Sequence, residues 1–404
     1  MLSGIRVLDC CEEPGFLAGK ILAELGADVV KLEPPGGDAW GRRGPYLGDV
    51  EDPNRSLRWL ALNTSKRGIT LDLDQGRGQQ LFRRLAARAD VVLESFAPGH
   101  MDDRGIGWDA LSAELPRLVY CALTPFGRSG PWAGFRARDL VVVALGGNAF
   151  VTGDPDRPPV HCTLPTAYLH AGPEVATGVA LALWQRAESG AGQLLDVSLQ
   201  EIQLSTLMTG PGLYARSGVL PRRSGARLGR TREIWRARDG DVSFGLRGGP
   251  ARVPGLRALV AWMAEEGTAP DWLRDYDWEA YNHHTLSDAE IARLEQAFGD
   301  FFAARTRREL YGQALARRIM LAPCNDAREI LSQPQLRHRG FFTRVEYPEL
   351  GASLEHPGSF ARSDRGAIGI RRRAPRVGEH NAEIYAEIGI GAAELLDLRA
   401  KGVV

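Results

Sequence analysis

In residues 1–125, short apolar runs alternate with stretches in which apolar residues recur every three or four positions. The apolar runs predict strands and the spaced pattern predicts helices. The predicted strands are 5–11, 28–33, 68–73, 90–96 and 118–125, and helices are predicted at 16–25 and 75–89. Strands that alternate with helices favour an α/β fold, a parallel sheet with helices on both faces. Ligands of such sheets bind beyond the carboxyl ends of the strands.

The pattern changes after residue 125. Residues 138–147 and 172–186 are helical in spacing, 193–199 predicts a strand that runs into a helix, and 210–232 is rich in Gly, Pro and Arg, as in a long connection. A helix pair is predicted at 381–388 and 392–401. We expect 1–210 to form the N-terminal part of a large α/β domain, 211–330 a smaller α+β domain with its connecting loop, and 331–404 the return segment and C-terminal helices of the large domain.

Composition narrows the class of protein. The hydrophobic fraction of 44%, the charged fraction of 25% and the net charge of zero are those of an ordinary globular protein. This charge balance argues against binding to nucleic acid or to an anionic membrane surface. No apolar run approaches the ~20 residues that span a bilayer, so we expect a soluble, cytoplasmic protein. The five cysteines form no CxxC pair, and we expect neither disulfides nor a metal site.

Eight short motifs follow one another along the chain. They are LSGIRVLD (2–9), ILAELGADVVKLEPPGGD (21–38), NTSKRGITLDL (63–73), ADVVLESFAPG (89–99), GIGWDAL (105–111), TPFGRSGPWAG (124–134), SGAGQLLDVSLQE (189–201) and the tail GEHN, EIGI and LRAKGV (378–403). In this order the chain resembles the family III coenzyme A transferases (CaiB/BaiF, of the formyl-CoA and carnitine-CoA transferase type) over nearly its whole length.

The resemblance implies a Rossmann-like large domain built from both ends of the chain, a small domain between them, and two chains interlocked like linked rings. It also implies covalent chemistry, in which an enzyme carboxylate attacks an acyl-CoA thioester and CoA passes to an acceptor acid. CoA thioesters are then the substrates, and no bound cofactor is expected.

The chain departs from the family at the centre of this chemistry. The family's nucleophilic aspartate falls on Tyr168, in the run from Pro159 to Gly172. A tyrosine has an ordinary pKa of about 10 and is a poor acyl acceptor at neutral pH. In the racemase branch a histidine precedes an aspartate, but Arg138 stands before Asp139 here and cannot shuttle a proton. We therefore assign no catalytic residue, although His161 and His170 flank Tyr168 and could serve in acid/base chemistry.

The resemblance also marks positions for CoA binding. These are Glu13, Pro14 and Gly15 in the first turn, Lys66 and Arg67 in NTSKRG, Ser95 and Phe96 in ESFAPG, and Arg104 as a basic residue that follows. Phe96 is the expected adenine platform, whereas Glu13 would repel an anionic nucleotide. Near the C-terminus, Asn381 is a plausible helix cap.

Three functions remain open. The first is a non-catalytic subunit, paired with a paralogue that carries the aspartate. Residues 12–38 and 63–73 are similar to the large-subunit type of a heteromeric branch that moves CoA from succinyl-CoA to benzylsuccinate in toluene degradation. The second is a homomeric acyl-CoA-processing enzyme, of isomerase or racemase type, with a different catalytic residue. The third is a dinucleotide-dependent oxidoreductase, favoured by Glu33 at a strand end, although Gly15-x-x-x-Gly19 lacks the GxGxxG spacing.

Overall fold

The computed structural model describes residues 1–207 and 209–404, which divide into two compact units. The first unit comprises 1–149, 161–220 and 335–404, and the second comprises 150–160 and 221–334. Residues 150–160, which the sequence assigned to the large domain, therefore cluster with the second unit. Among the described residues, no helix combines the length and apolar composition that a bilayer crossing requires.

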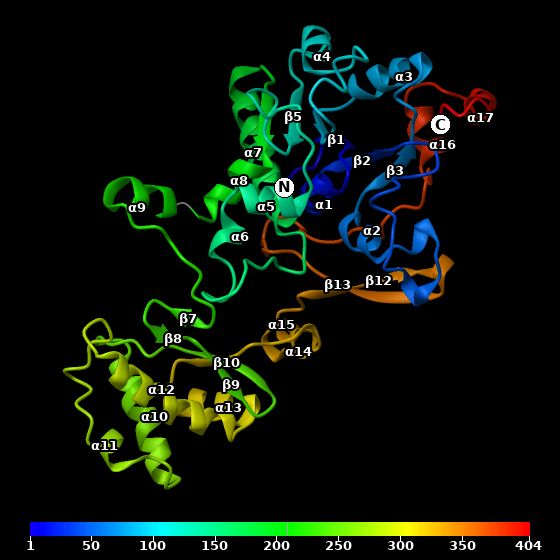
Figure 1. Cartoon of the computed structure of the whole chain (residues 1–404). Helices are drawn as coiled ribbons and strands as arrows, with labels where there is room; N and C mark the ends of the chain where they lie inside the picture. Colours follow the sequence, from blue (N-terminus) through cyan, green and yellow to red (C-terminus); the bar gives the residue numbers. More distant parts are fainter. Residues whose placement is uncertain (208) are drawn as a thin grey trace. The chain divides into compact units, whose positions relative to one another are not determined.

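The first unit is built on a six-stranded parallel sheet (Figure 1), which confirms the predicted α/β fold. Its strands lie in the order β3-β2-β1-β4-β5-β6. They are β1 (Arg6–Cys10), β2 (Asp28–Glu33), β3 (Arg67–Thr70), β4 (Val91–Glu94), β5 (Val119–Thr124) and β6 (Leu194–Ser198). The strand order reverses between β1 and β4, so the loops after these two strands border the crevice in which such sheets bind ligands.

Helices cover both faces of this sheet. Leu8 and Cys10 belong to the core on one face, whereas Val7 and Cys11 belong to the core on the other, as strand alternation requires. The first face is covered by α3 (Gly76–Ala86), α4 (Trp108–Glu114), α16 (Asn381–Glu387) and α17 (Ala392–Ala400), and the second by α1 (Phe16–Glu24), α5 (Asp139–Leu145), α7 (Thr166–Ser189) and α8 (Leu199–Ser205). In Figure 1 the red C-terminal helices and the green α7 and α8 lie on opposite sides of the strands.

The C-terminal segment is tied to the sheet by side chains. Asn381 accepts a hydrogen bond from the Thr70 backbone N–H at 2.9 Å and donates one to Thr70 Oγ1 at 2.8 Å. The cap position of α16 is His380, so the prediction that Asn381 caps this helix is wrong.

The long connection predicted at 210–232 is partly regular, because it contains most of α9 and two short strands. These elements are α9 (Thr209–Ser217), β7 (Arg227–Leu228) and β8 (Thr231–Arg232).

Short elements complete the first unit. They are the 3-10 turns η1 (Glu13–Gly15), η2 (Leu47–Asp49), η3 (Pro53–Arg55) and η4 (Pro348–Leu350), the helix α2 (Leu57–Leu62), and the hairpin β12 (Phe342–Tyr347) with β13 (Ala352–Pro357). Tyr347 of this hairpin shares a small core with Phe16 and Trp59. The helix α6 (Asn148–Val151) has residues in both units.

The second unit packs helices on a three-stranded antiparallel sheet of order β11-β10-β9. Its elements are β9 (Ile234–Ala237), β10 (Gly240–Phe244), β11 (Leu321–Pro323), α10 (Val253–Glu265), α11 (Asp271–Arg274), α12 (Asp288–Ala303), α13 (Arg307–Arg317) and α14 (Ala327–Ser332), with α15 (Pro334–His338) at its boundary. Trp235, Phe244 and Phe302 form edge-to-face pairs at its centre.

Candidate functional site

The loops after β1 and β4 are joined at the point where the strand order reverses. The Glu12 N–H donates to Ser95 Oγ at 2.8 Å, and the Phe96 N–H donates to Glu94 Oε2 at 2.7 Å. The Phe96 ring stacks on His100 at 4.4 Å, and Arg104 donates to the His100 carbonyl at 2.7 Å. Ser95, Phe96 and Arg104 therefore lie on one loop, and their contact with CoA stays a prediction from the motif.

Glu94 is a titratable group of this region that the sequence reasoning missed. It ends β4, and its side chain is almost fully buried. Burial raises the pKa of Glu94 to about 7, against the opposing effect of the Phe96 N–H. A carboxyl at the carboxyl end of a buried parallel strand was the signal that could have identified it.

Glu13 does not present an unpaired charge in the first turn. Its carboxylate forms an ion pair with Arg58 and lies 3.6 Å from the Arg43 guanidinium. The side chain is only 8% exposed, so both arginines compensate it inside the chain. This corrects the expectation that Glu13 would repel an anionic nucleotide.

Lys66 and Arg67 belong to internal networks. Lys66 is fully buried, and its ammonium donates to Asp9 Oδ2, the Phe16 carbonyl and Asn63 Oδ1 at 2.8–2.9 Å. These three bonds use all its donors. The Arg67 guanidinium is surrounded by three carboxylates, those of Asp28, Glu383 and Glu387. Both cationic groups therefore have internal partners, and a contact of either with CoA stays a prediction from the motif.

The glycines of the first turn are required by packing. A Cβ at Gly15 would lie 2.4 Å from Cys11 Sγ, and one at Gly19 would lie 2.2 Å from Asp9 Oδ2 and 2.8 Å from Lys66 Nζ. Pro14 begins the 3-10 turn η1, which leads into α1. Because both glycines make room for neighbouring side chains, they do not support the dinucleotide-binding alternative.

Tyr168 lies at the start of α7, where three residues meet. Its hydroxyl accepts a hydrogen bond from the Asp139 N–H at 3.1 Å. Asp139 Oδ1 in turn accepts from the Ala167 N–H at 2.8 Å, and Asp139 Oδ2 lies 2.8 Å from His161 Nε2. Burial raises the pKa of Tyr168, so the phenol is neutral at physiological pH.

The two histidines that flank Tyr168 differ in their surroundings. His161 contacts Asp139, a carboxylate that the sequence reasoning left without a role. His170 Nδ1 lies 3.2 Å from Gln203 Nε2 instead. Asp139 therefore links Tyr168 with His161, while His170 has a separate partner.

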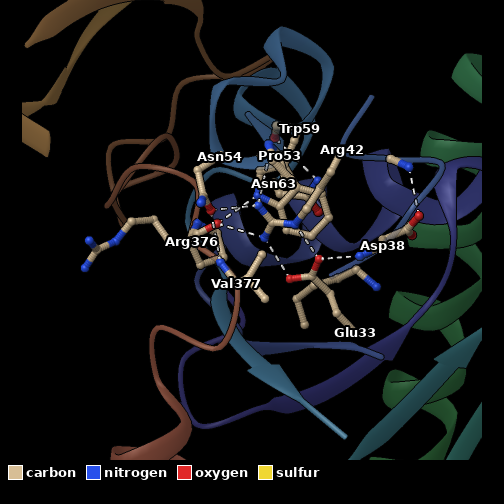
Figure 2. A network of polar contacts seen from close by, with 12 residues as sticks. Glu33, Asp38, Arg42, Pro53, Asn54, Trp59, Asn63, Arg376 and Val377 are labelled. Atoms are coloured by element: carbon tan, nitrogen blue, oxygen red, sulfur yellow. Dashed lines mark hydrogen bonds and ion pairs between the residues drawn. The ribbon is translucent and has the colours of Figure 1, made fainter. Parts of the chain in front are cut away.

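A buried ion pair holds the loop between β2 and α2 (Figure 2). Arg42 contacts both carboxylate oxygens of Glu33, at 2.5 and 2.7 Å, and its guanidinium lies 3.6 Å above the Trp59 ring. Arg42 and the Trp59 indole also donate to the Pro375 carbonyl. Glu33 is thus a structural anchor of this loop in the present fold.

The loop between β2 and α2 places the Trp40 ring against the side chain of Arg138. The Arg138 guanidinium lies 3.9 Å from the centre of the Trp40 ring, and Arg43 lies 5.0 Å from it. The Trp40 N–H is held by Asp38 Oδ1 at 2.8 Å, and the Asp38 N–H by Glu33 Oε2 at 2.9 Å. A chain of hydrogen bonds that begins at the sheet therefore holds the backbone of Trp40, whose ring contacts the Arg138 guanidinium.

Known proteins resemble this chain from end to end. The model of CoA-transferase family III matches residues 2–381. The chain is 33% identical over 403 residues to the succinyl-CoA:(R)-benzylsuccinate CoA-transferase subunit BbsE of Thauera aromatica, with 100% of this chain and 98% of that protein covered. It is 32% identical to a formyl-CoA:oxalate CoA-transferase of Streptomyces avermitilis, with 100% and 99% covered. A solved structure of a CaiB/BaiF family protein from Brucella suis superposes with a TM-score of 0.83 at 27% identity, covering 96% of this chain and 98% of the other.

Proposed function

The chain belongs to CoA-transferase family III, and from this premise we propose that it is the non-catalytic subunit of a heteromeric CoA-transferase. The observation that carries the proposal is the neutral phenol of Tyr168, hydrogen-bonded to the Asp139 N–H, at the position of the family's nucleophilic carboxylate. In the expected reaction a carboxylate oxygen attacks the thioester carbonyl, the C–S bond breaks, and CoA leaves as the thiolate. A protonated phenol cannot begin this step at neutral pH.

The acids near Tyr168 are poorly suited to replace the missing nucleophile. Both carboxylate oxygens of Asp139 are engaged, one by the Ala167 N–H and the other by His161. Glu13 is buried between Arg43 and Arg58. Partial burial and the charge of Asp38 raise the pKa of Glu12, which reduces its ionised fraction. The nucleophile of the proposed complex is therefore an aspartate of a paralogous partner chain.

The named relative supports a substrate class. It is a subunit of a transferase for succinyl-CoA and (R)-benzylsuccinate, and it aligns with the whole of this chain. We infer that the proposed complex takes succinyl-CoA as CoA donor and a substituted succinate, such as benzylsuccinate, as acceptor. An interlocked pair of chains would bury an obligate interface well above ~2,000 Å².

Co-purification and adduct mapping test this proposal together. The native protein is isolated and incubated with succinyl-CoA, and borohydride then reduces any carboxyl activated as an anhydride or thioester to an alcohol. We expect a second family III chain at equal stoichiometry, with the reduced residue mapped by mass spectrometry to an aspartate of that chain. A reduced residue in the present chain, or turnover by a homodimer of it, would overturn the non-catalytic assignment.

The contact between His161 and Asp139 favours a second candidate, an acyl-CoA isomerase or racemase. A carboxylate 2.8 Å from Nε2 holds the imidazole in one orientation, as in acid/base pairs. Such an enzyme would exchange the α-proton of an acyl-CoA with solvent. Deuterium incorporation from D₂O by the homomeric chain, abolished in His161→Gln, would establish this candidate in place of the first.

A further inference from the structure

We propose that Trp40, Arg138 and Tyr168 form a non-covalent binding site for the carboxylate of a dicarboxylic acid. The choice of a dicarboxylic acid rests on the proposed function, whereas the carboxylate chemistry rests on the residues themselves. Two hydrogen-bond donors of this site, the Arg138 guanidinium and the Tyr168 hydroxyl, have no acceptor among the residues that the structure describes.

Arg138 supplies the charge. Its guanidinium stacks on Trp40 at 3.9 Å, is exposed, and forms no ion pair within residues 1–207 and 209–404. Stacking on an aromatic ring uses the flat face of a guanidinium and leaves its in-plane N–H groups available. These groups match a carboxylate in a bidentate geometry.

Tyr168 supplies a neutral donor. Because its oxygen accepts the Asp139 N–H at 3.1 Å, its own proton is free to point to a different acceptor, and no described residue takes it. Burial raises the pKa of Tyr168, so this proton is retained at physiological pH. The charge of Arg138 acts on the pKa of the same phenol in the opposite direction.

The backbone fixes these two donors relative to each other. Arg138 directly precedes Asp139, whose N–H contacts Tyr168, and the Arg138 carbonyl accepts from Val141 and Val142 at 2.9 and 3.1 Å as α5 begins. Trp40 is held by Asp38 from the other side. The donors are therefore pre-organised, which lowers the entropy cost of binding an anion.

The neighbouring acids are largely compensated. Glu13 is paired with Arg58 and Arg43, and the Asp139 carboxylate is hydrogen-bonded by His161 and by the first backbone N–H groups of α7. Glu12 interacts with the charge of Arg138 but forms no ion pair with it among the described residues, and partial burial raises the pKa of Glu12. A ligand carboxylate thus meets a cation that has no ion pair in the described part of the chain.

Binding of succinate to the native protein, as isolated and without acyl-CoA, tests the site. Titration calorimetry is performed on the wild type, Arg138→Gln, Arg138→Lys and Tyr168→Phe, with far-UV circular dichroism to check folding. Arg136→Gln is the matched control, because Arg136 is exposed, lies two residues earlier and has no ion pair in the described part of the chain. Succinamide, which keeps the shape without the charge, is the matched ligand control.

We expect Arg138→Gln to weaken succinate binding at least tenfold, and Tyr168→Phe and Arg138→Lys to weaken it severalfold. In the Arg138→Gln complex, the number of succinate molecules bound should be lower by one for each copy of the chain described here. Any site on the partner chain should be unaffected. Arg136→Gln should bind as the wild type does, and succinamide should not bind. Absence of saturable succinate binding, or equal binding by Arg138→Gln, overturns the site. The adduct-mapping result does not depend on either outcome, so the site and the proposed function can fail separately.

Discussion

Replacing Lys66 by methionine separates a structural role of this residue from a role in CoA binding. The substitution nearly conserves the length of the side chain but removes the ammonium that contacts Asp9 Oδ2 at 2.8 Å. Both partners are fully buried, and the change leaves the Asp9 carboxylate without its nearest cation. Loss of one partner of a buried ion pair costs about 3–5 kcal/mol in the free energy of unfolding. Lys31 is near Asp9, so we expect a value toward the lower end of this range.

The assay is urea unfolding of the full chain, followed by circular dichroism, beside a CoA-binding measurement. Lys401→Met is the matched control, because Lys401 pairs with Asp397 at 2.7 Å on the surface, where such a pair contributes about 0.3–0.5 kcal/mol. We expect a large loss of stability in Lys66→Met and almost none in the control. A loss below about 1 kcal/mol in Lys66→Met, together with a marked loss of CoA affinity, would show that Lys66 reaches the ligand and that its buried position is not the functional one.

Three further predictions concern the same region and the thiols. Burial raises the pKa of Glu94 to about 7, so the folded state binds a proton that the unfolded state releases near pH 4.5. The free energy of unfolding should therefore fall between about pH 4.5 and 7. Denaturant titrations in a pH series should show this decline in the wild type and not in Glu94→Gln. Gly19→Ala should lower the free energy of unfolding by more than about 2 kcal/mol, because the added Cβ would clash with the ion pair of Asp9 and Lys66. Gly76→Ala is the control, since a Cβ there meets open space, and thermal melts should show it to be neutral or slightly stabilising. A thiol reagent should modify the exposed Cys162 and Cys324 rapidly, and the three buried cysteines only after unfolding; rapid labelling of a buried thiol would contradict the packing of the sheet.

The large domain was well determined by the sequence. Strands of a parallel sheet are buried on both faces, so they appear as nearly continuous apolar runs, and the runs at 28–33 and 118–125 correspond to β2 and β5. The ordered motifs likewise indicated the family, and the absence of a carboxylate at Tyr168 was visible in the sequence itself. These features are local, because each depends on residues that are close together in the chain.

The environment of each charged side chain was decided by the tertiary structure. Lys66 meets Asp9 and Glu13 meets Arg58, across 57 and 45 residues of sequence, and no local pattern relates such positions. The contact between Asp139 and Tyr168 likewise spans 29 residues, and the pairing of Asn381 with Thr70 spans 311. A side chain binds a ligand only if folding leaves it a free donor or acceptor. That condition depends on long-range contacts, which is why the motif named Lys66 and Arg67 as CoA contacts although the fold uses both of them internally.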